Sequence, residues 1–197
     1  MGSEMCIRDR IYALGDDFTI ETGGGDDRIE ITSDVESAVN NPNNFNNGFF
    51  AENRFTIRAG SGEDRIELTA SNENDPGFFV EDFFVVDGGI GDDRIELLAR
   101  NDGQSSVGFF AQDILRIEGG GGDDRITLGG DHRSENGASF VGQLHDILAG
   151  TGDDRVSVSE RQEGAFDHDD ITFDGGSGND RLDNDINNAD IFNFEDI

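Results

Sequence analysis

The chain has no lysine and no tryptophan, and it contains a single cysteine and two prolines. With only Cys6 available, an internal disulfide framework is excluded, so packing or bound metal must stabilise the fold. All 14 cationic side chains are arginines, against 44 acidic residues, which gives a formal net charge of −30. We expect no nucleic-acid partner, because binding nucleic acid requires a basic surface that releases counterions. No apolar run reaches the length of a membrane span, so we expect no membrane span either.

Hydrophobic residues are also scarce, at 34% of the 197 positions, whereas glycine occurs 28 times. A compact globular domain is usually richer in apolar residues. Disorder is a poor explanation, because the acidic residues recur at fixed positions beside β-branched and aromatic residues, which disordered segments lack. The charge is therefore organised, and such an arrangement favours bound cations.

A glycine- and aspartate-rich turn recurs six times along the chain. Its copies run from Gly23 to Ile29 and, in the same form, over residues 60–66, 89–95, 120–126, 150–156 and 176–182. Successive copies of its second aspartate are separated by 37, 29, 31, 30 and 26 residues. These aspartates are Asp27, Asp64, Asp93, Asp124, Asp154 and Asp180. The period indicates a repeat architecture with one turn per unit of about thirty residues.

Apolar residues flank each turn at two-residue spacing, which predicts β-strands. In the third copy they are Phe84 and Val86 before the turn, then Ile95 and Leu97 after it. A further phenylalanine stands 14 residues before the aspartate in the five later units and is predicted to form a stacked core column: Phe50, Phe79, Phe110, Phe140 and Phe166. Because a single unit cannot bury its inward face alone, the units must stack.

These patterns predict an all-β fold, a right-handed parallel β-helix (β-solenoid) of six coils of about thirty residues, with three short strands each. We assign the solenoid to residues 11–184, and residues 185–197 to a C-terminal cap or a truncated next coil. Residues 1–10 match nothing later in the chain and resemble translated adapter sequence. We interpret them as a non-native leader, and the rest as a fragment of something longer.

The turn sequence suits a hard cation. Its glycines permit backbone conformations that other residues avoid, so that carbonyl groups converge on a small concavity with the aspartate at its rim. Calcium takes six to eight oxygen ligands from carboxylates and carbonyls, and two stacked turns can supply them.

The turn also resembles the nonapeptide repeat of RTX (repeats-in-toxin, hemolysin-type) calcium-binding proteins, Gly-Gly-x-Gly-x-Asp-x-apolar-x. Residues 88–96 match every fixed position, as do 119–127 and 175–183; Thr22, Ala59 or Ala149 replaces the first glycine elsewhere. The RTX roll has two such repeats per shorter coil, so this chain is similar to a long-coil variant found in large bacterial surface proteins. The resemblance implies five calcium ions between stacked turns, held by the six aspartates and by turn carbonyls of Gly23, Gly25, Gly60, Gly62, Gly89, Gly91, Gly120, Gly122, Gly150, Gly152, Gly176 and Gly178.

The arginine after each turn aspartate offers another way to balance the charge. Strand alternation places it on the opposite face from that aspartate, together with the preceding acidic residue and with Glu30, Glu67 and Glu96. We therefore expect an outer salt-bridge ladder, formed by Arg28, Arg65, Arg94, Arg125, Arg155 and Arg181. If alternation continues into the turn, the stacked aspartates still need a cation, because neighbours about 5 Å apart repel by about 3 kcal/mol at an effective dielectric constant of about 20.

Catalysis has little support in the sequence. His132, His145 and His168 occupy different phases of the repeat, and His145 falls in a core column. A polysaccharide lyase or epimerase would need a base and cationic groups gathered at one place. We therefore expect a non-enzymatic, calcium-binding segment of an extracellular or bacterial cell-surface protein, structural or adhesive, whose folding depends on calcium. Its expected partners are calcium ions, neighbouring domains of a longer chain, and a surface polysaccharide or protein ligand. A calcium-independent spacer and a β-helix module of a polysaccharide-acting enzyme are the alternatives.

Overall fold

The computed structural model describes residues 4–7, 17–35, 49–51, 53–72, 78–80, 82–101, 107–111, 113–132, 138–141, 144–160, 171–184 and 189–195. These residues form three sheets in which all neighbouring strands are parallel, with no helix among the described elements. The predicted parallel β-solenoid is confirmed. None of the described residues belongs to a helix long and apolar enough to cross a membrane.

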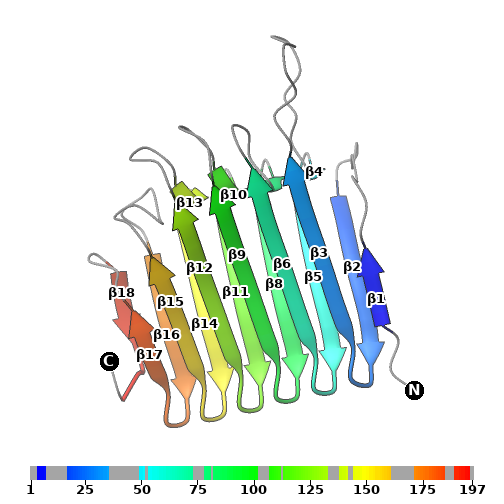
Figure 1. Cartoon of the computed structure of the whole chain (residues 1–197). Coiled ribbons are helices and arrows are strands. Elements are labelled where there is room, and N and C mark those ends of the chain that lie inside the picture. Colours follow the sequence, from blue (N-terminus) through cyan, green and yellow to red (C-terminus); the bar gives the residue numbers. More distant parts are fainter. Residues whose placement is uncertain are drawn as a thin grey trace, which may run out of the picture.

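Two long sheets form the sides of the solenoid. Sheet A contains, in spatial order, β1 (Glu4–Ile7), β3 (Arg28–Val35), β6 (Arg65–Asn72), β9 (Arg94–Asn101), β12 (Arg125–His132), β15 (Arg155–Glu160) and β17 (Arg181–Asn184). Sheet B contains β2 (Asp17–Gly24), β5 (Arg54–Ser61), β8 (Phe83–Ile90), β11 (Ile114–Gly121), β14 (Leu144–Thr151), β16 (Ile171–Ser177) and β18 (Ala189–Phe192). Strands of the two sheets alternate along the chain, as Figure 1 shows.

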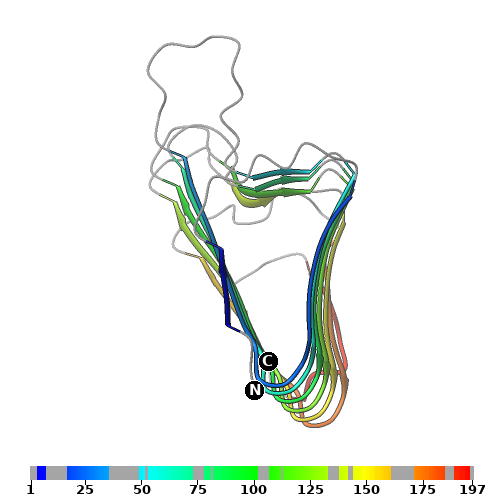
Figure 2. The same cartoon turned by 90° about the vertical axis from the view of Figure 1, so that its right-hand side faces the viewer.

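A third, shorter sheet closes the cross-section. Sheet C contains β4 (Phe49–Ala51), β7 (Phe78–Val80), β10 (Val107–Ala111) and β13 (Ala138–Val141). Viewed along the stack, sheets A and B converge at an apex formed by the six turns, and sheet C lies on the opposite side (Figure 2). A complete coil thus runs from sheet C to sheet B, through the turn, and into sheet A.

The interior consists of columns in which equivalent residues of successive coils stack on one another. Phe55 and Phe84 are fully buried, their ring centroids lie 5.0 Å apart, and Phe18 continues the stack at 5.6 Å from Phe55. Phe109 of sheet C approaches Phe84 at 6.1 Å. Burial alternates along β8, β11 and β14, as the two-residue spacing predicted, whereas Thr56 in β5 is buried together with its neighbours Phe55 and Ile57.

The phenylalanine column of sheet C differs from its prediction by one residue. Phe140 pairs in register with Phe109, not with Phe110, because Phe109 precedes its turn aspartate by one residue more than Phe140 does. Phe109 is the buried member, at 1% exposure. Phe50, Phe79 and Phe110 align with one another. The structure does not describe the burial of their side chains, and Phe166 lies outside the described residues.

Both ends of the solenoid carry an additional strand. β1 falls within residues 1–10 and pairs with β3 from Glu4↔Arg28 to Ile7↔Ile31. β18 falls within residues 185–197 and pairs with β16. The interpretation of residues 1–10 as a non-native leader remains a prediction.

Candidate metal site at the turn aspartates

All twelve glycines predicted to shape the turns have positive φ, from 87° at Gly176 to 152° at Gly178. In the fourth turn, a Cβ added at Gly122 would lie 2.3 Å from the carbonyl oxygen of Gly91 in the coil before. Side chains are therefore excluded both by backbone conformation and by the close approach of the stacked turns. This geometry directs the glycine carbonyl oxygens along the stack, toward the next turn.

The six turn aspartates form a buried column, here called the aspartate ladder: Asp27, Asp64, Asp93, Asp124, Asp154 and Asp180. Their exposures are only 1–3%. Each points to the same side as the apolar residue two positions later, as with Asp93 and Ile95, because side chains alternate along a strand. The predicted placement of these aspartates opposite the arginines is confirmed.

One oxygen of every ladder carboxylate after Asp27 accepts a hydrogen bond from the preceding turn. The backbone N–H of Asp93 donates to Oδ1 of Asp124 at 2.8 Å, and Asp124 N–H donates to Oδ1 of Asp154 at 2.7 Å. The same bond links the remaining pairs at 2.7–2.8 Å, namely Asp27 to Asp64, Asp64 to Asp93, and Asp154 to Asp180. Sequence reasoning missed this bond, by which each of the five later aspartates caps the turn of the preceding coil.

The second oxygen of the carboxylate is buried and lacks a hydrogen bond. This holds for Oδ2 of Asp64, Asp93, Asp124, Asp154 and Asp180. In the third and fourth coils Oδ2 lies against the first turn residue: a Cβ added at Gly88 would lie 2.7 Å from Oδ2 of Asp93, and one added at Gly119 would lie 2.6 Å from Oδ2 of Asp124. Glycine at the first position leaves this space open in those two coils, whereas Ala59 and Ala149 stand there in the second and fifth turns and are fully buried.

Burial raises the pKa of the ladder carboxyl groups. Desolvation is the largest cause, the backbone N–H bond opposes it, and neighbouring aspartates add to it. The pKa rises to about 7 for Asp124 and to about 6 for Asp93 and Asp154. The pKa values of Asp64 and Asp180 are raised for the same leading reason. The ladder thus holds its negative charge at a cost, which a bound cation or proton relieves.

A second, exposed aspartate column binds the turns in the opposite direction. Oδ1 of Asp123 accepts the backbone N–H of Asp153 in the next coil at 2.8 Å, and Oδ1 of Asp92 accepts that of Asp123 at 2.9 Å. Asp26 and Asp153 make equivalent bonds to Glu63 and Asn179. These residues were expected to belong to the salt-bridge face, but their oxygens bind backbone amides. Their recurrence directly before the ladder aspartates was the sequence signal that could have predicted this column.

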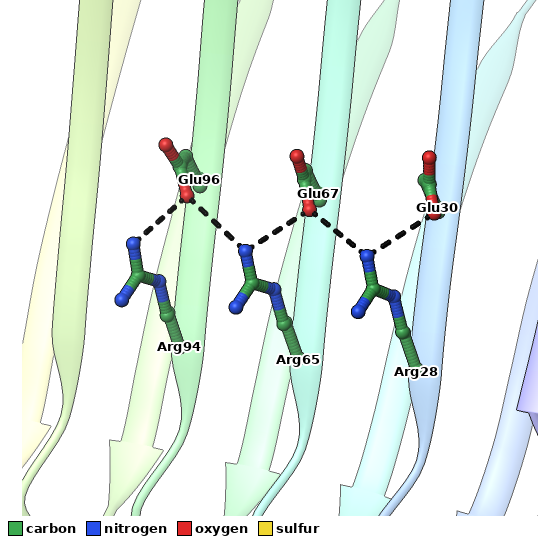
Figure 3. Close-up of polar contacts among 6 residues, drawn as sticks. All are labelled: Arg28, Glu30, Arg65, Glu67, Arg94 and Glu96. Atoms are coloured by element: carbon green, nitrogen blue, oxygen red, sulfur yellow. Dashed lines mark hydrogen bonds and ion pairs between the residues drawn. The ribbon is translucent and has the colours of Figure 1, made fainter.

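The outer arginine ladder is present and follows the predicted pairing with glutamates (Figure 3). Arg28 contacts Glu30 of its own coil at 3.2 Å and Glu67 of the next at 3.5 Å, and Arg65 contacts Glu67 at 3.1 Å. Arg65 and Arg94 both contact Glu96. The ladder neutralises charge on the outer face of sheet A and does not reach the buried aspartates.

The arginine ladder is interrupted at the fourth coil. Thr127 and Ser157 stand in the column that glutamates occupy in the earlier coils, and the described residues give Arg125 no acidic partner. Beyond the interruption, Arg155 and Arg181 share Asp183, which lowers the pKa of that carboxyl group. The predicted ladder therefore holds for five of its six arginines.

The donors of the ladder match the chemistry of calcium. Each interior coil offers one buried carboxylate oxygen without a hydrogen bond. Next to it is a backbone carbonyl oxygen of the following turn: Oδ2 of Asp124 and the carbonyl oxygen of Ala149 both lie within 3 Å of where a Cβ of Gly119 would be. Hard oxygen donors of these two kinds are calcium ligands. Within the described residues, no three or more His, Cys, Asp or Glu side chains gather as a metal cluster. Backbone carbonyls would therefore have to supply most of the ligands, as the turn glycines permit.

The two histidines in the described part of the chain lie on different sheets. His145 is completely buried in the core column, in register with Leu115 and Ile171. His132 ends β12 on sheet A, and His168 lies outside the described residues.

Comparison of the chain with protein-family models, with curated proteins and with solved structures finds no match. The all-parallel solenoid and its aspartate ladder are therefore established from the structure of this chain, and no related protein adds to them.

Proposed function

We propose that this chain is a calcium-binding, structural or adhesive repeat segment of a secreted or bacterial cell-surface protein, whose coils become ordered when calcium binds. The observation that carries the proposal is the column of buried carboxylate oxygens without hydrogen bonds, in Asp64, Asp93, Asp124, Asp154 and Asp180. An anionic oxygen buried without a partner is strongly unfavourable. Calcium would neutralise it with donors that the adjacent turns already present.

The residues that would hold calcium are the six ladder aspartates and the carbonyl groups of the twelve positive-φ glycines. When bound, calcium would supply the positive charge that the interior of the turn lacks. A ligand that binds only the folded chain stabilises it by mass action, in proportion to the logarithm of its concentration. Calcium is scarce inside cells and reaches millimolar levels outside, and extracellular calcium modules bind at about 10⁻⁴–10⁻³ M. The segment would then order after export.

The proposed role is structural, not catalytic. The ionisable side chains that recur along the stack are used in the ladders, where they bind backbone amides or one another. A stack of this kind extends in one dimension and can separate neighbouring domains of a longer chain or present a surface to a polysaccharide or protein ligand.

A calcium-independent spacer is the second candidate, and two observations favour it. Oδ1 of each ladder aspartate after Asp27 already accepts a backbone N–H, which ties consecutive turns together. The glycine carbonyls also lie directly against the next turn: a Cβ added at Gly89 would lie 2.1 Å from the carbonyl oxygen of Gly60. In this account protons neutralise the buried carboxylates, and the coils stack without metal.

Two neighbouring aspartates of one turn distinguish these functions. Asp124→Asn removes a buried ladder charge but retains an oxygen acceptor, whereas Asp123→Asn makes the same change in the exposed column. After metal is removed with a chelator, calorimetric titration with calcium should show fewer bound ions in D124N than in the wild type. D123N should bind the same number of ions as the wild type. If neither the wild type nor D123N binds calcium, and D124N is simply more stable, the spacer account is correct.

A further inference from the structure

The sixth turn is followed by a segment that completes it without repeating its sequence. β18 lies against β16, with Ile171 opposite Ala189 and Phe173 opposite Ile191. Ala189 and Ile191 thus continue the apolar spacing of the earlier coils. Figure 1 places β18 at the end of the stack, beyond β16. The glycine- and aspartate-rich turn that follows every earlier strand of sheet B is absent after β18: the chain reads Asn193-Phe194-Glu195.

Glu195 makes the two bonds that link each turn to the next. Its Oε2 accepts the backbone N–H of Asp180 at 2.6 Å, as Oδ1 of Asp180 accepts that of Asp154 at 2.8 Å. Its own backbone N–H donates to the carbonyl oxygen of Asp180 at 3.0 Å. In the preceding coil, that second bond comes from Arg181, which donates to Asp154 at 2.9 Å.

A single residue therefore replaces both an aspartate and the arginine after it. The backbone of Glu195 occupies the position of an arginine in the ladder, one residue beyond that of the aspartate. Its side chain is one methylene longer than that of aspartate, which allows the carboxylate to reach back to the N–H of Asp180. This geometry explains a glutamate here, where all six turns have aspartate.

Asn193 supports the same arrangement. It is the sole non-glycine residue with positive φ in the described part of the chain, at 56°, a conformation that asparagine tolerates better than most residues. Its side-chain amide donates to Oδ1 of Asp174 at 2.7 Å. Its carbonyl oxygen lies 2.2 Å from where a Cβ of Gly175 would be, so the tight stacking of the earlier turns is retained.

We propose that residues 189–195 form a dedicated C-terminal cap of the solenoid, in which Glu195 replaces the next ladder aspartate and Asn193 stacks on Gly175 in the place of the next first turn residue. The cap supplies the sixth turn with the acceptor that a seventh coil would otherwise supply. β18, the edge strand of sheet B at this end, has four residues, and short edge strands limit further pairing. Terminal repeats of solenoids commonly require such atypical capping units.

The cap does not depend on the calcium proposal and can be tested separately by amide hydrogen exchange on the full chain under fixed conditions. Glu195→Ala removes the acceptor of the Asp180 N–H, and Glu195→Gln retains an oxygen at that place. The Asp180 amide should exchange about tenfold faster in E195A, which corresponds to about 1.4 kcal/mol. It should exchange at close to the wild-type rate in E195Q. The Asp93 amide, three coils away, is the internal reference and should be unchanged in both variants.

Asn193→Gly gives a second test, since glycine keeps the positive φ but loses the bond to Asp174. Protection of the Asp180 amide should persist in N193G, because its acceptor remains. Equal exchange of Asp180 in wild type and E195A would overturn the proposal. So would equally fast exchange in E195A and E195Q, because charge rather than the acceptor would then explain the effect.

Discussion

The backbone N–H of Asp93 donates to Oδ1 of Asp124, while Oδ2 of the same Asp124 carboxylate is buried without a hydrogen bond. The two oxygens of one group thus have opposite roles. Oδ1 stabilises the stack of turns, and Oδ2 makes its charge costly to bury. The first role requires no metal, whereas the second is the reason to expect a cation or a proton.

Stability of the metal-free chain should depend on pH in a definite direction. The pKa of Asp124 in the folded chain is about 7, and those of Asp93 and Asp154 are about 6, whereas the pKa of an aspartate in an unfolded chain is about 3.9. The folded chain therefore binds more protons between about pH 4 and 7, so the free energy of unfolding falls as pH rises through this window. Urea unfolding in chelator at about pH 5, 6, 7 and 8 measures the effect. A free energy that rises over this range would contradict the raised pKa values.

D124N provides the control for that pH dependence. Asparagine does not titrate, so the slope of unfolding free energy against pH should be shallower in D124N than in the wild type. D123N, altered in the exposed column, should change the slope less than D124N does, because Asp123 is only a secondary cause of the raised pKa of Asp154.

The two glycine types within one turn should respond differently to alanine. Gly122 has a φ of +129°, and its added Cβ would lie 2.3 Å from the Gly91 carbonyl oxygen. Gly121 lacks a left-handed φ, and its added Cβ would meet only Oγ1 of Thr151 at 3.1 Å. We expect G122A to lower the free energy of unfolding by about 2–4 kcal/mol, from backbone strain and overpacking. G121A should change it by less than about 0.5 kcal/mol. Chemical denaturation measures both, and equal losses would contradict the stacked-turn geometry.

The interruption of the arginine ladder should be repairable. Glu30, Glu67 and Glu96 each contact the arginine of their own coil, and the last two also contact that of the preceding coil. Thr127→Glu places a carboxylate between Arg125 and Arg94 and should raise the free energy of unfolding by about 0.3–1 kcal/mol at low salt. The gain should shrink at high ionic strength. Thr127→Gln is the uncharged control, and an equal gain from T127Q would rule out ion pairing as its cause.

Much of the fold followed from the sequence because each coil repeats the same local rules. Positive-φ glycines, two-residue apolar spacing and a fixed turn aspartate are local features. When the coils stack, each of these features becomes a column. Strand alternation also placed Asp124 inside and Arg125 outside. The one-residue offset between Phe110 and Phe140 was missed, because equal spacing from the turn does not ensure equal register across a connection.

The hydrogen bonds of the ladder were less accessible to sequence reasoning. That Oδ1 of Asp124 accepts a backbone N–H and that Oδ2 is buried depends on side-chain rotamers and on the distance between coils. The role of Glu195 was equally hidden, because it stands at the position of an arginine and reaches back to that of an aspartate. The apolar residues Ala189 and Ile191 were the available sign of a further partial coil.

The most direct test of the calcium account is to measure the melting temperature of the full chain by circular dichroism at neutral pH. The calcium concentration is varied from zero, in chelator, to about 10 mM. The account predicts a low melting temperature or little β signal in chelator, and a melting temperature that climbs with the logarithm of calcium concentration. Magnesium is the control, since it prefers a rigid octahedral shell and retains water ligands. A β spectrum and melting temperature that stay constant across the whole calcium range would contradict it.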